Sequence, residues 1–226
     1  MKQDFLTYKI TYTIIALNLL SYLVSSLFSG DIIDIDITAL ANLGAIYGPA
    51  VVLYHEWWRL LTAMFLHGGM IHLLMNMFSL YLIGRGAEQY FDTKSYLGIY
   101  FFSGIIGGLV SIVMHPASVG VGASGAIFGI FGALAGFFIA HREQIAAHTK
   151  AFMKEFAIII GINIVIGFSI ASVDVSAHVA GLVAGFIGGY MVSKNPKWLF
   201  LYAFIMVSIA ILIAYYLQGQ YAKPIL

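Results

Sequence analysis

Two residues of this chain, a serine and a histidine, have types and positions that suit acyl-transfer chemistry. Ser124 stands between glycines in the segment Gly122-Ala123-Ser124-Gly125, at the start of an apolar stretch, and His178 stands near the start of a later one. A serine hydroxyl becomes a good nucleophile only when a neighbouring base takes its proton, and histidine titrates near neutrality. Because ionisable groups in lipid are costly and usually functional, the pair predicts a nucleophile and its base.

The composition indicates a membrane protein. The 226 residues are 61% hydrophobic and only 9% charged, whereas soluble domains carry about 25% charged residues. The chain has no cysteine and a formal net charge of +1, which excludes a disulfide framework and a thiolate metal site and argues against a nucleic-acid surface. The first apolar run lacks a small-residue cleavage site before Asp31, so we expect an uncleaved first span.

Seven stretches are long and apolar enough, or nearly so, for membrane helices, which need about 20 apolar residues. They lie at about 10–29, 69–86, 95–114, 123–140, 154–172, 176–193 and 197–217. The pattern predicts an all-α polytopic membrane protein. The segment 30–66 is too long for a turn, and with Trp57, Trp58 and Arg59 it predicts a structured external loop that lies partly in the headgroup region.

The basic residues predict the orientation. If the N-terminus is cytoplasmic, nine of the eleven lysines and arginines fall inside: Lys2, Lys9, Arg85, Lys94, Arg142, Lys150, Lys154, Lys194 and Lys197. Only Arg59 and Lys223 then fall outside. This bias follows the positive-inside rule and, with seven spans, places the C-terminus outside.

In this topology the helices at 69–86, 123–140 and 176–193 all run inward, so their first turns reach a similar depth near the outer face. His72 and Asn76, four residues apart, share one face of the first of these helices. Glycine stripes on the other two predict close helix packing that could bring Ser124 and His178 within hydrogen-bond reach. The stripes are Gly125, Gly129, Gly132 and Gly136, and Gly181, Gly185 and Gly188 or Gly189.

Four motifs together resemble those of the rhomboid family of intramembrane serine proteases. Gly122 to Gly125 resembles the family's GxSG serine motif, and Ala177-His178-Val179-Ala180-Gly181 with Gly185 resembles its histidine helix. The segment 67–76 is similar to the family's HxxxxHxxxN motif, and Trp58-Arg59 to the pair in its first external loop.

The resemblance implies a rhomboid-like six-helix bundle plus one C-terminal span. It places a short cytoplasmic N-terminus at 1–9, the protease core with its external loop 30–66 at 10–193, and an extra helix with an external tail at 194–226. The implied protein is a multi-pass endopeptidase of the cell (inner) membrane, without cofactor or metal. Its partners would be the lipid bilayer and transmembrane protein substrates, which would reach the site laterally past the helix at 154–172.

The resemblance also implies residue roles. Ser124 would be the nucleophile and His178 the general base and then acid, while His72, Asn76 and the Ser124 backbone N–H would form the oxyanion hole. Phe128 stands where many relatives carry a tyrosine that stacks on the histidine. Supporting positions would be Phe128 with the residues Gly122, Gly125, Gly181, Gly185, Trp58 and Arg59.

Other assignments are weaker. Asp174, one turn before His178, could complete a triad, but we interpret it as a solvated loop residue and expect a Ser–His dyad. We expect His55, His67 and His115 to lie in or near external loops. We interpret His55 and His115 as solvated, and His67 as a structural residue that can hydrogen-bond within its loop. We do not interpret the chain as a metalloprotease, because the sequence has no HExxH motif. An inactive rhomboid-like escort protein usually lacks the serine or histidine, and a small transporter predicts midplane charges and repeats that the sequence does not show.

Overall fold

The computed structural model describes residues 2–144, 158 and 173–222, and these are mostly helical. In chain order the elements are α1 (Lys2–Thr7), α2 (Lys9–Ser29), α3 (Ile37–Asn42), β1 (Ile46–Tyr47), α4 (Gly48–Val52), α5 (Arg59–Thr62), η1 (Ala63–Phe65), α6 (Met70–Ala87), α7 (Thr93–Met114), β2 (Val119–Gly120), α8 (Ser124–Ala140), α10 (Val175–Lys194), η2 (Pro196–Trp198) and α11 (Leu199–Tyr221). The predicted all-α fold is confirmed, apart from one ribbon formed by β1 and β2.

Four helical segments of the described residues are long and apolar enough to cross a membrane. They are α2, α7, α10 and the continuous segment Pro196–Tyr221, while α8 is a shorter apolar helix. The expected span at 69–86 forms as α6 but is not among the four, because His72, Asn76 and Arg85 lower its hydropathy. The expected span at 154–172, and with it the predicted lateral access route, lies outside the described residues except for Ile158.

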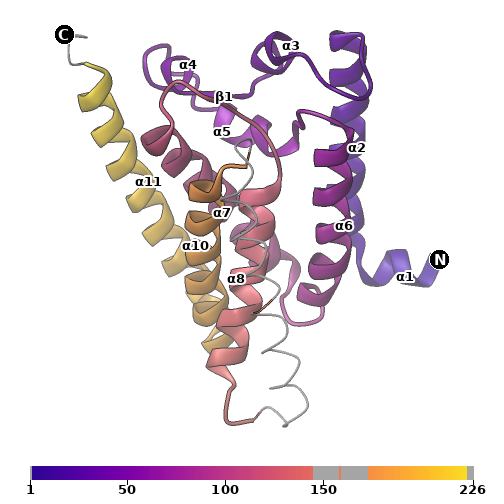
Figure 1. The fold of residues 1–226 in the computed structure, drawn as a ribbon. Coiled ribbons are helices and arrows are strands. Elements are labelled where there is room, and N and C mark those ends of the chain that lie inside the picture. The colour runs from indigo at the N-terminus through magenta and orange to yellow at the C-terminus, as the bar shows by residue number, and fades with distance from the viewer. Residues whose placement is uncertain (1, 145–157, 159–172, 223–226) are drawn as a thin grey trace.

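The long helices form one bundle, in which α6 contacts both α2 and α8 (Figure 1). Helix α8 packs mainly against α10 and α7, α11 covers α7 and α10 from the outside, and α2 packs against α6. Helices α6, α8 and α10 run in the same direction, and their N-terminal ends lie at the end of the molecule that carries α3, α4 and α5. The first turns of these three helices therefore meet at one end of the bundle.

The glycine stripes explain how closely α8 and α10 approach. A Cβ atom on Gly181 would collide with the Gly125 carbonyl, and one on Gly185 would collide with the Gly129 carbonyl. Gly132 and Gly136 likewise face the backbone of α10. The predicted close packing is confirmed for these positions, whereas Gly188 faces Tyr202 of α11 and Ile99 of α7 instead.

Charged side chains connect the N-terminal helices α1 and α2 to the C-terminal end of α6. The Glu88 carboxylate accepts hydrogen bonds from the backbone N–H groups of Ile10 (3.1 Å) and Thr11 (2.7 Å), which begin α2. Arg85 donates to Asp4 over 2.8 Å. These contacts satisfy free N–H groups at the start of α2 and join the N-terminal helices to the end of α6.

The loop between α2 and α6 is held together by Arg59. Its guanidinium donates to the carbonyls of Ala41 (2.6 Å) and Ala45 (3.0 Å) and pairs with Glu56. It also lies over the Trp58 ring, 4.9 Å from the ring centre. Trp58 and Arg59 thus order the loop between α2 and α6, and no described contact joins either side chain to Ser124 or His178.

Candidate active site

The structure places the Ser124 hydroxyl beside the His178 ring. The distance from Ser124 Oγ to His178 Nε2 is 2.7 Å, within hydrogen-bond range. Ser124 is the first residue of α8 and His178 lies in the first turn of α10. Both side chains are partly buried, and at this distance a proton can pass between them.

The His178 ring is held from its face by Phe128. The two rings are nearly parallel, with an interplanar angle of 10° and centres 4.4 Å apart. Phe128 lies one turn after Ser124 on the same helix, so α8 supplies both the hydroxyl and the ring beneath the imidazole. Stacking of this kind restricts rotation of the imidazole and keeps Nε2 directed at Ser124.

His72 reaches the segment that precedes Ser124. Gly122 has φ of +126°, a conformation open to glycine and unfavourable for other residues. A Cβ atom at this position would lie 2.8 Å from His72 Nε2 and 3.8 Å from Ser124 Oγ. Glycine at 122 therefore lets the His72 ring and the Ser124 hydroxyl face a common space, and its N–H donates to the Ala63 carbonyl over 2.9 Å.

Asn76 is buried, and one of its amide hydrogens is already used. Its Nδ2 donates to the His72 carbonyl one turn earlier over 3.1 Å, and the residue is 6% exposed. An amide nitrogen carries two hydrogens, so a second donor remains. No hydrogen bond among the described residues joins Asn76 to Ser124 or His178.

Asp174 caps the helix that carries His178 and does not bond to its ring. The carboxylate accepts from the Ala177 N–H over 3.1 Å and from the Ser176 hydroxyl, and it lies 3.8 Å from His115 Nε2. Burial acts to raise the pKa of Asp174, but hydrogen bonds from Ser111, Ser176 and Ala177 outweigh it and hold the pKa below its ordinary value. Asp174 is thus a helix N-cap, half-withdrawn from solvent rather than a fully solvated loop residue.

His67 is buried beside His72. Its side chain is 0% exposed, and neither ring nitrogen has a hydrogen-bond partner of normal geometry, although the Phe65 carbonyl lies nearby. The ring meets His72 edge to face, with centres 5.0 Å apart. Burial lowers the pKa of His67 to about 3, and His72 acts in the same direction, so the ring is neutral. The burial of His67 agrees with a structural role, although the suggested hydrogen bond within the loop does not form with normal geometry, and His55 is exposed as expected.

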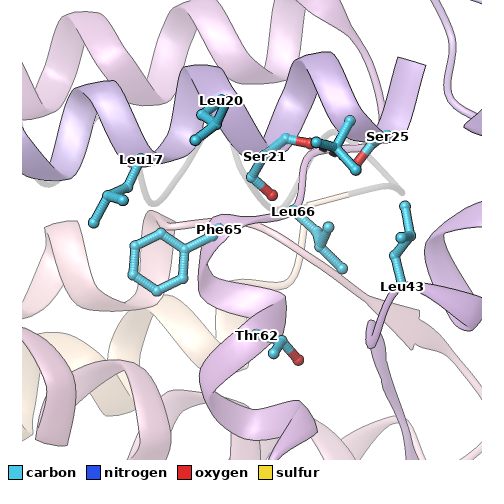
Figure 2. Close-up of a pocket in the computed structure, with 9 residues that line it drawn as sticks. Leu17, Leu20, Ser21, Ser25, Leu43, Thr62, Phe65 and Leu66 are labelled. Carbon is cyan, nitrogen blue, oxygen red and sulfur yellow. Dashed lines mark hydrogen bonds between the residues drawn. The ribbon is translucent and has the colours of Figure 1, made fainter. Parts of the chain in front are cut away.

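An apolar groove lies away from these residues. Figure 2 shows a cavity of about 390 Å³ between α2 and the loop that ends at Leu66. Its lining is mostly apolar, from Leu17, Leu20, Val24, Leu43, Phe65 and Leu66, with the hydroxyls of Ser21, Ser25 and Thr62. None of the predicted site residues lines it. Among the described residues, no three His, Cys, Asp or Glu side chains are grouped so as to hold a metal ion.

The fold and this site together define a polytopic helical membrane protein with a serine–histidine pair at one end of its bundle. A family model described as the Rhomboid domain matches residues 54–195, which is more than half of the chain. The chain belongs to the rhomboid family and is a multi-pass membrane protein.

Individual relatives agree with this family. The chain is similar to "Rhomboid protease GluP" of Bacillus subtilis, 33% identical over 75% of this chain and 32% of the relative. It is also similar to "RHOMBOID-like protein 6, mitochondrial" of Arabidopsis thaliana, 38% identical over 71% of this chain and 52% of the relative. The "Putative rhomboid protease YdcA" of B. subtilis is 34% identical over 61% of this chain and 64% of the relative. The matched regions thus span between a third and two thirds of these relatives.

Proposed function

We propose that this protein is an intramembrane serine endopeptidase that hydrolyses peptide bonds in or near the transmembrane segments of other membrane proteins. The observation that carries the proposal is the 2.7 Å separation between Ser124 Oγ and His178 Nε2, with Phe128 stacked on the imidazole. Family membership adds weight, because curated relatives carry the name rhomboid protease.

In this proposal Ser124 attacks the scissile carbonyl while His178 accepts the hydroxyl proton. The imidazolium then gives that proton to the leaving amine, the acyl-enzyme is hydrolysed by water, and His178 acts again as base and acid. Asp174 takes no direct part, because its carboxylate is engaged at the helix N-terminus. The reacting pair is a dyad.

The oxyanion of the tetrahedral intermediate would be stabilised by three donors. The Ser124 backbone N–H lies at the N-terminus of α8, where amide hydrogens lack partners within the helix and the helix dipole favours negative charge. His72 faces the space beside Ser124, and Asn76 has a second amide hydrogen. Loss of one side-chain donor would lower kcat by about 100- to 1,000-fold.

The substrate class follows from the setting of the pair. A transmembrane helix hides its own carbonyls in hydrogen bonds, so a substrate must unwind locally before Ser124 can attack. We expect substrates with small or helix-weakening residues near the end of their span. The bilayer is a second partner, and the proposed orientation places the N-terminus in the cytoplasm, the C-terminus outside, and the site open to the extracytoplasmic side.

The test is cleavage of a single-span substrate in liposomes by the wild type, Ser124→Ala and His178→Ala, with labelling of the serine by a fluorophosphonate. We expect cleavage and labelling by the wild type and loss of both in the two variants, with unchanged thermal unfolding. An escort protein would instead bind the substrate equally in all three and cleave it in none. Cleavage by Ser124→Ala at the wild-type rate would contradict the proposal.

A further inference from the structure

The C-terminal end of α11 packs against the loops that lead to Ser124. The Tyr221 hydroxyl donates to the Pro116 carbonyl over 2.8 Å. Gly48, the first residue of α4, completes the contact, since a Cβ atom on it would collide with both the Tyr221 hydroxyl and the Pro116 carbonyl. Three segments far apart in sequence therefore meet at one point, at the end of the molecule where Figure 1 shows α4 and the last turns of α11.

A small hydrophobic core lies beneath this contact. Leu217, one turn before Tyr221, is 2% exposed although it lies near the end of the outermost helix. It belongs to a cluster, separate from the main core, that joins α11 to α7 and to the loop elements before α6. The cluster comprises Ile46, Val51, Val52, Leu60, Ala63, Leu109, Ile112 and Leu217. Leu217 is the contribution of α11 to the buried part of this second core.

The same elements hold the segment 116–122 that precedes the serine. Ile46 and Tyr47 of β1 pair antiparallel with Gly120 and Val119 of β2. Two residues further on, the Gly122 N–H donates to the carbonyl of Ala63, a member of the second core. The positions of Pro116, of β2 and of Gly122 are thus all fixed by groups that pack on α11 or on its partners.

We infer that the C-terminal end of α11, through Leu217 and Tyr221, is a positioning element that fixes the segment 116–122 and hence the geometry of Gly122, His72 and Ser124. This inference rests on the proposed function. Helix α11 lies outside residues 54–195 that match the Rhomboid domain, so the role would be an addition to the matched core. Leu217 and Tyr221 do not touch the reacting atoms and act through Pro116, β1 and Ala63.

The same helix provides matched controls. Leu212 and Tyr215 of α11 are 67% and 77% exposed, so they face away from the second core. Leu212→Ala and Tyr215→Phe remove the same groups as Leu217→Ala and Tyr221→Phe but alter no contact with the loops. Effects of composition, hydropathy or detergent binding should therefore appear in both pairs of variants. An effect that depends on contact with the loops should appear only in Leu217→Ala and Tyr221→Phe.

The experiment measures kcat, KM, the rate of fluorophosphonate labelling and the melting temperature for these four variants, for Gly48→Ala and for the wild type. At a temperature well below melting we expect Tyr221→Phe to lower kcat and labelling by roughly 3- to 10-fold, the size of one lost hydrogen bond. KM should change by less than about 2-fold, and Leu217→Ala should have a larger effect. Gly48→Ala, which displaces Pro116 and Tyr221 from the other side, should also lower kcat.

The outcomes distinguish the proposed protease function from the positioning role of α11. A wild type that neither cleaves nor reacts with the fluorophosphonate would overturn the proposed function and this inference with it. An active wild type whose Tyr221→Phe and Gly48→Ala variants melt at lower temperature but keep the wild-type kcat would overturn the inference alone, because α11 would then only stabilise the fold. If Leu217→Ala does not fold, the other two variants decide the question.

Discussion

The imidazole of His178 depends on Phe128 for its orientation, since the two rings stack with centres 4.4 Å apart. Contacts of this kind contribute about 0.5–1.5 kcal/mol, so Phe128→Ala is expected to lower kcat by roughly 3- to 10-fold. Phe128→Tyr keeps the ring and should stay within about 2-fold of the wild type. Steady-state cleavage kinetics measure this, with Phe78→Ala at a 62% exposed position as the control. Equal loss in the alanine and tyrosine variants would contradict stacking as the cause.

Asp174 is predicted to support stability without taking part in catalysis. Its folded pKa lies below the ordinary value, so the stability it adds is present above the unfolded pKa of about 4 and is lost as the pH falls through the folded pKa. Asp174→Ala should cost about 1 kcal/mol at pH 7 through the lost N-cap, and the difference from wild type should shrink toward pH 3. Thermal unfolding across this range measures it.

The activity of the same variant distinguishes a dyad from a triad. Loss of the acid in a true triad lowers kcat by about 10⁴-fold, whereas Asp174→Ala should stay within about 3-fold when measured well below its melting temperature. A loss of several orders of magnitude with the fold intact would show that Asp174 acts through His178 and would contradict the proposed dyad.

At the scale of single residues, the sequence indicates which side chains could react, but it does not predict their burial or the groups that pack on them. Ser124 and His178 stand out because polar groups are rare in apolar stretches, and His72 and Asn76 share a helix face by spacing alone. The burial of His67 does not follow from spacing, because it depends on the packing of segment 33–35 against 68–70, where Ile35 N–H donates to the Gly68 carbonyl over 3.0 Å. Its type and its place as the first residue of the HxxxxHxxxN motif were the signals available.

At the scale of the helices, the close contact between α8 and α10 makes Gly185 sensitive to substitution. Gly185→Ala directs a methyl group at the Gly129 carbonyl, which is backbone and cannot turn aside. We expect a loss of several kcal/mol or failure to fold, since the helices must separate. In α6, Gly86→Ala meets nothing within 4 Å and should leave stability unchanged or raise it by about 0.5–1 kcal/mol. Thermal unfolding in detergent compares them, and equal effects would contradict the packing argument.

Long helices were predictable and the loop between α2 and α6 was not. The spans expected at 10–29, 95–114 and 176–193 form as Lys9–Ser29, Thr93–Met114 and Val175–Lys194, because about 20 apolar residues leave few alternatives to a helix in lipid. The segment 30–66 contains short elements such as α3 and β1 whose existence depends on distant partners. The two-residue strand β1 exists only because it pairs with β2, more than 70 residues later.

At the scale of the whole molecule, the shared direction of α6, α8 and α10 makes the orientation in the membrane decisive for which compartment the site faces (Figure 1). The distribution of lysine and arginine predicts that this end faces outward. Because the chain contains no cysteine, single cysteines can report the orientation without background. Tyr54 lies 76% exposed in the loop at this end, and Gln144 follows the other end of α8.

We therefore expect Tyr54→Cys to react with a membrane-impermeant maleimide in intact cells, and Gln144→Cys to react only after permeabilisation. The physical reason is that in the proposed topology the two ends of α8 lie on different sides of the bilayer, so an impermeant reagent outside the cell reaches Tyr54→Cys and not Gln144→Cys. The cysteine-free wild type is the blank, and both variants must cleave substrate at the wild-type rate to show that insertion is unchanged. Labelling of Gln144→Cys alone in intact cells would invert the orientation and place the serine–histidine pair toward the cytoplasm, although the chemistry proposed for the pair would stand.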